Sequence, residues 1–106
     1  MTVLDQYREA KSLHPGMILL FRKDDFYELY EDDAKTVAKM FKLPLCHRQI
    51  GLTAEVTPMV GFAHRLLEKL LRTLLHKGHR VAICDQVEEV PQDRTVQRVV
   101  VPNAAM

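Results

Sequence analysis

Apolar residues recur at helical spacing in three segments of the chain, and each stripe forms one face of an amphipathic helix. In the first segment the stripe consists of Val3, Leu4, Tyr7 and Ala10. In the second it consists of Ala34, Val37, Ala38 and Phe41. In the third it consists of Leu66, Leu67, Leu70, Leu71, Leu74 and Leu75. Pro15-Gly16, Pro44 and Gly78 limit these segments, so the pattern predicts three helices that bury these stripes in a core.

Short apolar runs between the stripes predict strands. Met17 to Phe21 is continuously apolar, which suits a strand covered on both faces. Phe26 to Tyr30 follows after four charged residues and is rich in aromatic side chains, so the two runs predict a hairpin. The other predicted strands are Leu45 to His47, Val56 to Gly61, Val81 to Cys84 and Val96 to Val101. A loop from Gly51 to Glu55 is predicted between the first two of them.

The order of these elements predicts the fold class. Helix, hairpin, helix, strands, helix and strands together indicate an α/β fold, a small mixed β-sheet flanked by about three helices. A chain of 106 residues is long enough for one domain, which we expect to span residues 1–106. No apolar run reaches the roughly 18 residues of a membrane span, so no membrane partner is expected.

Charge is distributed unevenly although the net charge is only +1. Residues 24–33 contain six acidic side chains and no basic one, whereas residues 62–81 contain five basic side chains and the single acid Glu68. The domain as a whole is therefore not a basic nucleic-acid-binding protein, and any contact with phosphates is expected to be local and weak. Cys46 and Cys84 sit beside apolar residues, which predicts buried free thiols and favours a reducing cytoplasm.

Three motifs in order resemble one family. Asp25-Phe26-Tyr27-Glu28-Leu29 is similar to the "DFYEL" segment of MutS DNA mismatch repair proteins. Pro58-Met59-Val60-Gly61 resembles the "PMAG" segment of the family, and Val81-Ala82-Ile83-Cys84-Asp85-Gln86 resembles its "VAICEQ" segment. A bare Phe-x-Glu carries almost no information, but the three segments in this order are specific. The resemblance spans Leu4 to Pro102 and is to the N-terminal mismatch-recognition domain, domain I.

The resemblance implies a site for double-stranded DNA that contains a mismatch. In the family the Phe of this motif wedges into the minor groove and stacks on a mispaired or unpaired base, and the Glu two residues later hydrogen-bonds that base. Carried over, Phe26 is the wedge and Glu28 the base contact, with Lys23 and Arg48 as contacts to the DNA backbone. Residues i and i+2 of an extended segment share a face, so Phe26 and Glu28 should point together and Tyr27 the other way.

The wedge has a physical rationale. Inserting an apolar side chain between base steps costs a few kcal/mol of unstacking and kinks the duplex. A mismatch is already poorly stacked, so discrimination comes mainly from deformability of the DNA. Glu28 is expected either to accept a hydrogen bond from a base or, when protonated, to donate one.

The sequence departs from the family at several positions. Asp24 stands where the family usually has Gly; Asp tolerates the left-handed backbone region better than most residues, but its charge is expected to weaken DNA binding. Cys46-His47-Arg48-Gln49 replaces "TKRG", Ala63-His64 replaces Pro-Tyr, and Arg65 replaces a His. The ATPase, clamp and lever segments of the family are absent, so we expect either an excised fragment or a solitary recognition-like domain.

The chain is expected not to be an enzyme and to need no cofactor or metal, with ATP and Mg²⁺ expected only in a full-length MutS-type protein. Remaining MutS-type domains or other repair proteins are the expected protein partners. The main alternative is a MutS-domain-I-like protein-interaction module that no longer binds DNA. Other interpretations treat Phe26 as a core aromatic, Asp33-Ala34-Lys35 as part of a nuclease site, His76 and His79 as a metal pair, or the basic residues of the third helix as a phosphate patch.

Overall fold

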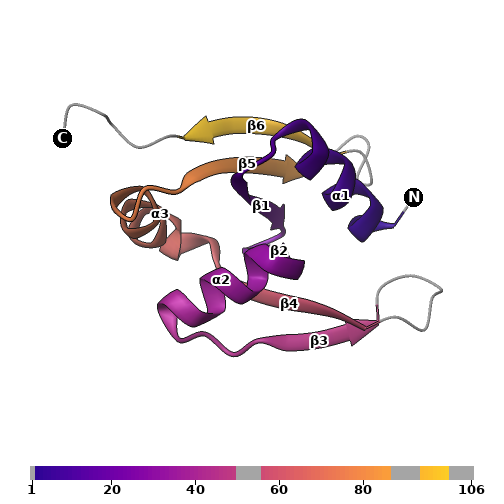
Figure 1. The fold of residues 1–106 in the computed structure, drawn as a ribbon, viewed down its shortest axis with the longest axis horizontal. Helices are drawn as coiled ribbons and strands as arrows, with labels where there is room; N and C mark the ends of the chain where they lie inside the picture. Colours follow the sequence, from indigo (N-terminus) through magenta and orange to yellow (C-terminus); the bar gives the residue numbers. More distant parts are fainter. Residues whose placement is uncertain (1, 50–55, 87–93, 101–106) are drawn as a thin grey trace.

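The computed structural model describes residues 2–49, 56–86 and 94–100, the last segment and residues 85–86 by their backbone alone. Figure 1 shows the arrangement of the elements. In chain order they are α1 (Val3–Leu13), β1 (Met17–Lys23), β2 (Phe26–Tyr30), α2 (Glu31–Phe41), β3 (Cys46–Gln49), β4 (Val56–Ala63), a 3-10 turn (His64–Leu66), α3 (Leu67–His76), β5 (Arg80–Gln86) and β6 (Arg94–Val100). The predicted α/β class is confirmed.

One six-stranded mixed sheet organises the domain, in the order β3-β4-β2-β1-β5-β6. β1 and β5 run parallel, and all other neighbours are antiparallel. The predicted hairpin is present, because Lys23 pairs with Phe26 across a turn of only two residues. Asp24 occupies the left-handed region in this turn, with φ of 53°, which Asp accepts more readily than most residues other than Gly.

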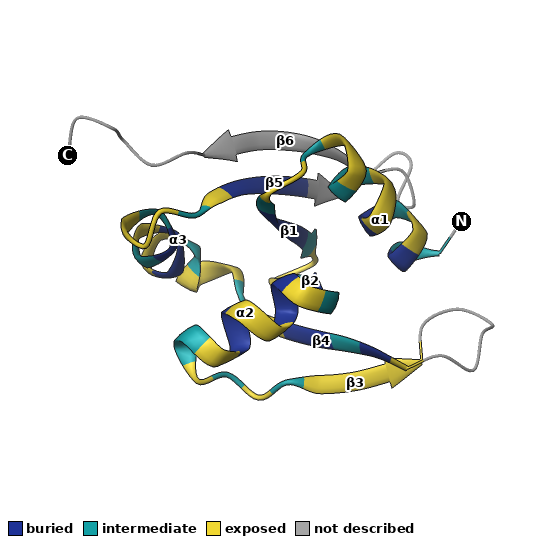
Figure 2. Cartoon of the chain, viewed as in Figure 1, coloured by how far each residue is buried: buried dark blue, intermediate teal, exposed yellow. Residues whose placement is uncertain are grey.

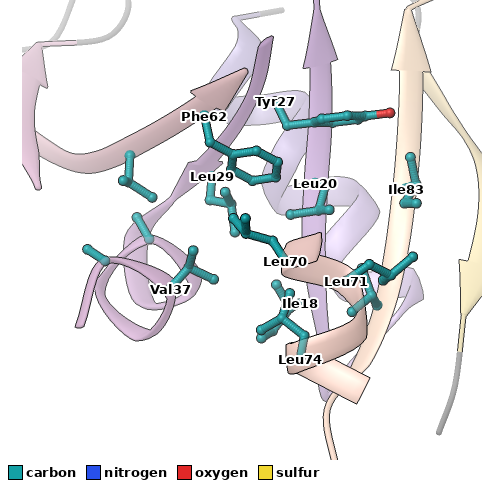
Figure 3. Close-up of a cluster of buried hydrophobic side chains, with 14 residues drawn as sticks. Ile18, Leu20, Tyr27, Leu29, Val37, Phe62, Leu70, Leu71, Leu74 and Ile83 are labelled. Carbon is teal, nitrogen blue, oxygen red and sulfur yellow. The ribbon is translucent and has the colours of Figure 1, made fainter. Parts of the chain in front are cut away.

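Helices α2 and α3 cover one face of the sheet. α2 packs on β2 and β4, and α3 packs on β5. Their apolar stripes meet the inward side chains of four strands in a core cluster that includes Leu20, Tyr27, Leu29, Leu70 and Leu74 (Figure 3). Fully burying one such leucine stabilises the fold by roughly 1.5–3 kcal/mol.

Helix α1 covers only part of the opposite face. It packs on β1 and lies beside β6, and its residues Leu4 and Tyr7 join a second cluster with Leu19, Phe21 and Tyr30. β1 therefore lies between helices on both faces, which explains why its run from Ile18 to Phe21 is buried throughout. This confirms the strand predicted to be covered on both sides.

A buried carboxylate ties α1 to the start of α2. Asp33 is 7% exposed, and both its oxygens lie 2.9 Å from Lys11 Nζ. The Tyr7 hydroxyl donates to Asp33 Oδ2, and the backbone N–H of Leu19 donates to the same atom at 3.1 Å. Burial, and then the neighbouring Asp33 carboxylate, raise the pKa of the Tyr7 hydroxyl well above its usual range.

Two burial predictions are wrong. Cys46 is exposed, because it begins β3, the edge strand, which is exposed at all four of its residues (Figure 2). Leu66 is 37% exposed, because it ends the 3-10 turn before α3 and does not belong to the buried face of that helix. The other predicted strands shift by one to two residues at their ends. The predicted loop from Gly51 to Glu55 lies outside the described residues, as does Val101.

Candidate nucleic-acid interface

The sheet face that carries α1, called the open face below, is exposed at Phe26, Gly61, Cys46 and Arg48, whereas Tyr30 and Thr57 on the same face are buried. β-pairing fixes which side chains share that face. Glu28 of β2 pairs with Gly61 of β4, and two positions further along β4 Met59 pairs with Cys46 of β3. Because side chains alternate along a strand, Phe26, Glu28, Gly61, Cys46 and Arg48 all belong to this face.

Phe26 begins β2 directly after the two-residue turn. Its side chain is 54% exposed, an unusual state for a large aromatic residue, whereas Tyr27 is 4% exposed and Leu29 is fully buried on the other face. The predicted alternation is therefore confirmed, and the interpretation of Phe26 as a core aromatic is wrong. Phe26 is flanked in the sheet by Lys23 of β1 and by Ala63 of β4.

Glu28 is half-buried, and a buried neighbour on its own strand holds its carboxylate. The Tyr30 hydroxyl donates to Glu28 Oε1 at 2.6 Å. Tyr30 is 1% exposed and meets two other aromatic rings edge to face, with centroids 5.3 Å away at Tyr7 and 6.3 Å away at Phe21. The carboxylate therefore stands on the open face in a defined position.

Phe26 and Glu28 line one pocket of about 220 Å³ together with Cys46, Arg48, Met59, Val60 and Gly61. Gly61 lines this pocket without contributing a side chain. A β-carbon built on Gly61 would lie 3.4 Å from the Tyr27 carbonyl oxygen, an ordinary contact, and the backbone there is not left-handed. Neither packing nor φ requires a glycine at this position, and a glycine within a strand often marks a close approach of a ligand.

Lys23 and Arg48, the two predicted contacts to the DNA backbone, differ in their position relative to the pocket. Arg48 is exposed and lines the pocket. Lys23 is exposed at the end of β1, directly opposite Phe26, but it does not line the pocket. Asp24 and Asp25 form the adjoining turn, so the Phe26 end of the site carries two acids beside Lys23, and the guanidinium of Arg22 donates to the Asp24 carbonyl oxygen.

The other sequence candidates lie away from this face or are otherwise occupied. The basic residues of the third helix are exposed, but α3 covers the opposite face of the sheet. Asp33 is buried and its carboxylate is held by Tyr7, Lys11 and the backbone of Leu19. Within residues 2–49, 56–86 and 94–100, no three His, Cys, Asp or Glu side chains are arranged to hold a metal ion. No described helix is long and apolar enough to cross a membrane.

Comparison with known proteins decides the family. A family model described as MutS domain I matches residues 1–105. The chain belongs to the MutS domain I family. It is 43% identical to a DNA mismatch repair protein MutS of Salinibacter ruber over 97% of the chain, and 41% identical to one of Chlorobium phaeobacteroides over 91%. A third MutS, of Methanosarcina mazei, is 39% identical over 95% of this MutS domain I. The chain spans only 11–12% of the length of these relatives.

Two residues of the site were missed from the sequence, Tyr30 and Gly61. Tyr30 follows Glu28 by two positions, so the alternation that groups Phe26 with Glu28 also places Tyr30 on the same face of this MutS domain I. Gly61 was seen only as part of a motif. Its position opposite Glu28 follows from the register of β2 against β4, which one sequence does not reveal.

Proposed function

We propose that this domain is a DNA mismatch repair recognition module that binds mismatched or unpaired bases in duplex DNA. Phe26 is the wedge and Glu28 the base contact, while Lys23 and Arg48 contact the phosphate backbone. The observation that carries the proposal is an exposed aromatic ring that shares one pocket with a half-buried carboxylate. Membership of the MutS domain I family supports it, and so do relatives named DNA mismatch repair protein MutS.

The ring would act by replacing a stacking partner of the target base. An exposed phenyl ring gains free energy when it leaves water, and this gain offsets part of the cost of unstacking one base step in the minor groove. A mismatched or unpaired base has already lost part of its stacking and pairing. The same insertion therefore costs less at a mismatch, and the energy difference provides the preference without a code of base-edge contacts.

The charged residues of the site have two roles, affinity for phosphates and selectivity for a base. Lys23 lies beside Phe26 in the sheet, and Arg48 lines the same pocket further along, where it pairs with Thr57 of β4. Each phosphate neutralised by such a cation releases counterions, which adds affinity without sequence preference. Glu28 is repelled by phosphates, and it stabilises the complex only when it forms a hydrogen bond with a base. Its contribution is therefore to selectivity for the mismatched base.

We assign no chemical step to this domain and no cofactor or metal. ATP and Mg²⁺ belong, in this proposal, to the remaining segments of a full-length MutS-type protein, whose other domains and repair partners are the proposed protein contacts. A cytoplasmic location is part of the same proposal.

The decisive experiment is a titration of the domain with two labelled duplexes of equal length, one fully paired and one with a single G·T mismatch, at low salt. Fluorescence anisotropy should show tighter binding to the mismatch, and Phe26→Ala should abolish the difference between the duplexes. Leu13→Ala is the control, since Leu13 is 71% exposed at the end of α1 and lies outside the site. Equal affinity of the unaltered domain for both duplexes would contradict the proposal and favour a protein-interaction module.

A further inference from the structure

Tyr30 places a hydroxyl at Glu28 from within the core. Its donated hydrogen bond reaches Oε1 at 2.6 Å, and Glu28 lines the pocket. We propose that Tyr30 is a positioning residue for Glu28, holding one carboxylate oxygen so that the other accepts a hydrogen bond from a mispaired or unpaired base that presents an N–H donor. This inference rests on the proposed function of the site.

The hydroxyl is fixed by its surroundings. The Tyr30 ring is 1% exposed, packs edge to face against Tyr7 at an interplanar angle of 68° and against Phe21 at 81°, and cannot move without disturbing this cluster. A glutamate on a strand otherwise has three rotatable side-chain bonds, and ordering it on DNA binding costs conformational entropy. The bond from Tyr30 supplies that order before DNA arrives, which is the general advantage of a preorganised contact.

The bond also assigns the two carboxylate oxygens of Glu28 to different partners. The Tyr30 hydroxyl donates to Oε1 and uses an acceptor lone pair there, which leaves the other oxygen, Oε2, as the acceptor for a base in this proposal. The base partner is then a donor, such as an amino group or an imino N–H that a mismatch has released from pairing. Bases that offer only ring nitrogen or carbonyl acceptors at the pocket gain nothing from this carboxylate and are disfavoured by its charge.

A purely structural role for the hydroxyl makes a different prediction. A buried tyrosine needs a partner for its O–H, and Glu28 could merely satisfy it. In that case removal of the hydroxyl changes the free energy of unfolding but does not change the contribution of Glu28 to the preference for mismatched DNA. The two roles are separable because Tyr30→Phe removes one oxygen atom and keeps the ring that packs against Tyr7 and Phe21.

A double-mutant cycle on the full chain tests the proposal. The ratio of affinities for G·T and fully paired duplexes is measured for the unaltered chain, Tyr30→Phe, Glu28→Ala and the double variant, with a thermal melt of each. Tyr30→Phe is expected to lower the ratio about three- to tenfold, the size of one hydrogen bond to a charged or neutral group. In the Glu28→Ala background the same change should alter the ratio by less than about 1.5-fold, because coupled residues are non-additive.

Each outcome decides a different point. If the unaltered chain prefers the mismatch and Tyr30→Phe prefers it equally, the positioning role is wrong while the proposed function stands. Equal losses from Tyr30→Phe with and without Glu28 would also overturn it, since the hydroxyl would then act without the carboxylate. No preference in the unaltered chain removes the proposed function and this inference together. If Tyr30→Phe melts far below the unaltered chain, the affinity ratios are measured at a temperature at which both proteins are fully folded, and the same loss is expected there.

Discussion

Gly61 lies directly opposite Glu28 in the ladder between β2 and β4, on the sheet face that carries Phe26. A glycine within a strand lacks a side chain to pack and loses more backbone entropy on folding than any other residue. Nothing in its own surroundings requires it, since a β-carbon fits there and φ is ordinary. The cost is understandable if the space beside Glu28 is reserved for a ligand.

Gly61→Val should separate stability from binding. Valine favours strands, so the free energy of unfolding should stay the same or rise by up to about 1 kcal/mol. Its methyl groups would enter the pocket beside Glu28, and binding to a G·T duplex should weaken about tenfold or more. Gly78→Ala is the matched control: Gly78 has φ of 90° at the end of α3, so that variant should lose roughly 1 kcal/mol of stability and keep its DNA affinity. Unchanged DNA binding by Gly61→Val would show that the pocket is not used.

Leu29→Ala should lower the stability of the domain, whereas Phe26→Ala should lower its preference for mismatched DNA. Leu29 is fully buried, so its truncation should cost about 2–5 kcal/mol in urea unfolding. Phe26 is 54% exposed, so its truncation should cost roughly 0.5 kcal/mol or less while the mismatch preference disappears. A domain that unfolds on Phe26→Ala but tolerates Leu29→Ala would mean that β2 is shifted by one residue, which exchanges its two faces.

Affinity for DNA should be weak and strongly dependent on salt. Few cations lie on the open face and two acids adjoin Phe26, so we expect a Kd for the G·T duplex no tighter than about 10⁻⁶ M at physiological salt. Removing a phosphate contact through Lys23→Ala or Arg48→Ala should reduce the slope of log affinity against log salt by about one. Leu13→Ala should leave that slope unchanged. A tight complex that resists salt would show that other parts of the chain hold phosphates.

The chain should not turn over ATP. The glycines Gly16, Gly51, Gly61 and Gly78 are far apart in the sequence, and none begins a Gly-x-x-x-x-Gly-Lys-Ser/Thr phosphate loop. A coupled assay for phosphate release, with and without mismatched DNA, should therefore read at the background of a heat-inactivated sample. Turnover that follows the domain through successive purification steps would contradict this expectation.

Alkaline pH should destabilise the domain through Tyr7. Its folded pKa is raised, so the stability that the neutral hydroxyl contributes is fully present below its unfolded pKa of about 10 and is lost as pH rises above that value. Above pH 10 the unaltered domain should lose roughly 1.4 kcal/mol more per pH unit than Tyr7→Phe, measured by urea unfolding at a series of pH values. Parallel curves for the two proteins would show that the hydroxyl ionises as readily when folded as when unfolded.

The sequence predicted those features that depend on local periodicity. Alternation along Phe26 to Leu29 was sufficient to assign the two faces of β2, although Tyr30 at its end is buried in the cluster with α1. The continuous apolar run of β1 was sufficient to infer a strand covered on both sides. The turn at Asp24 was likewise predictable, since the tolerance of Asp for positive φ is a property of the residue itself. The family was equally accessible, because three short motifs in order are specific.

Features that depend on how distant elements meet were not predictable. Cys46 has apolar neighbours, but its exposure follows from the edge position of β3 in the sheet. Asp33 looks like one more acid of an N-terminal helical turn, yet it is buried because α1 brings Tyr7 and Lys11 to it from more than twenty residues away. The pocket itself requires the register of three strands, which a single sequence does not contain.

The network around Asp33 has a mechanical consequence for the strand that precedes it. β2 is fastened at one end by the two-residue turn and at the other by α2, whose first turn is locked to α1 through Asp33. A strand that is held at both ends is rigid, so in the proposed complex the DNA duplex bends and the strand does not. The affinity of the domain for a duplex would then increase with the ease of bending that duplex. A duplex with a nick or gap at the contacted base step would therefore bind as a mismatched duplex does.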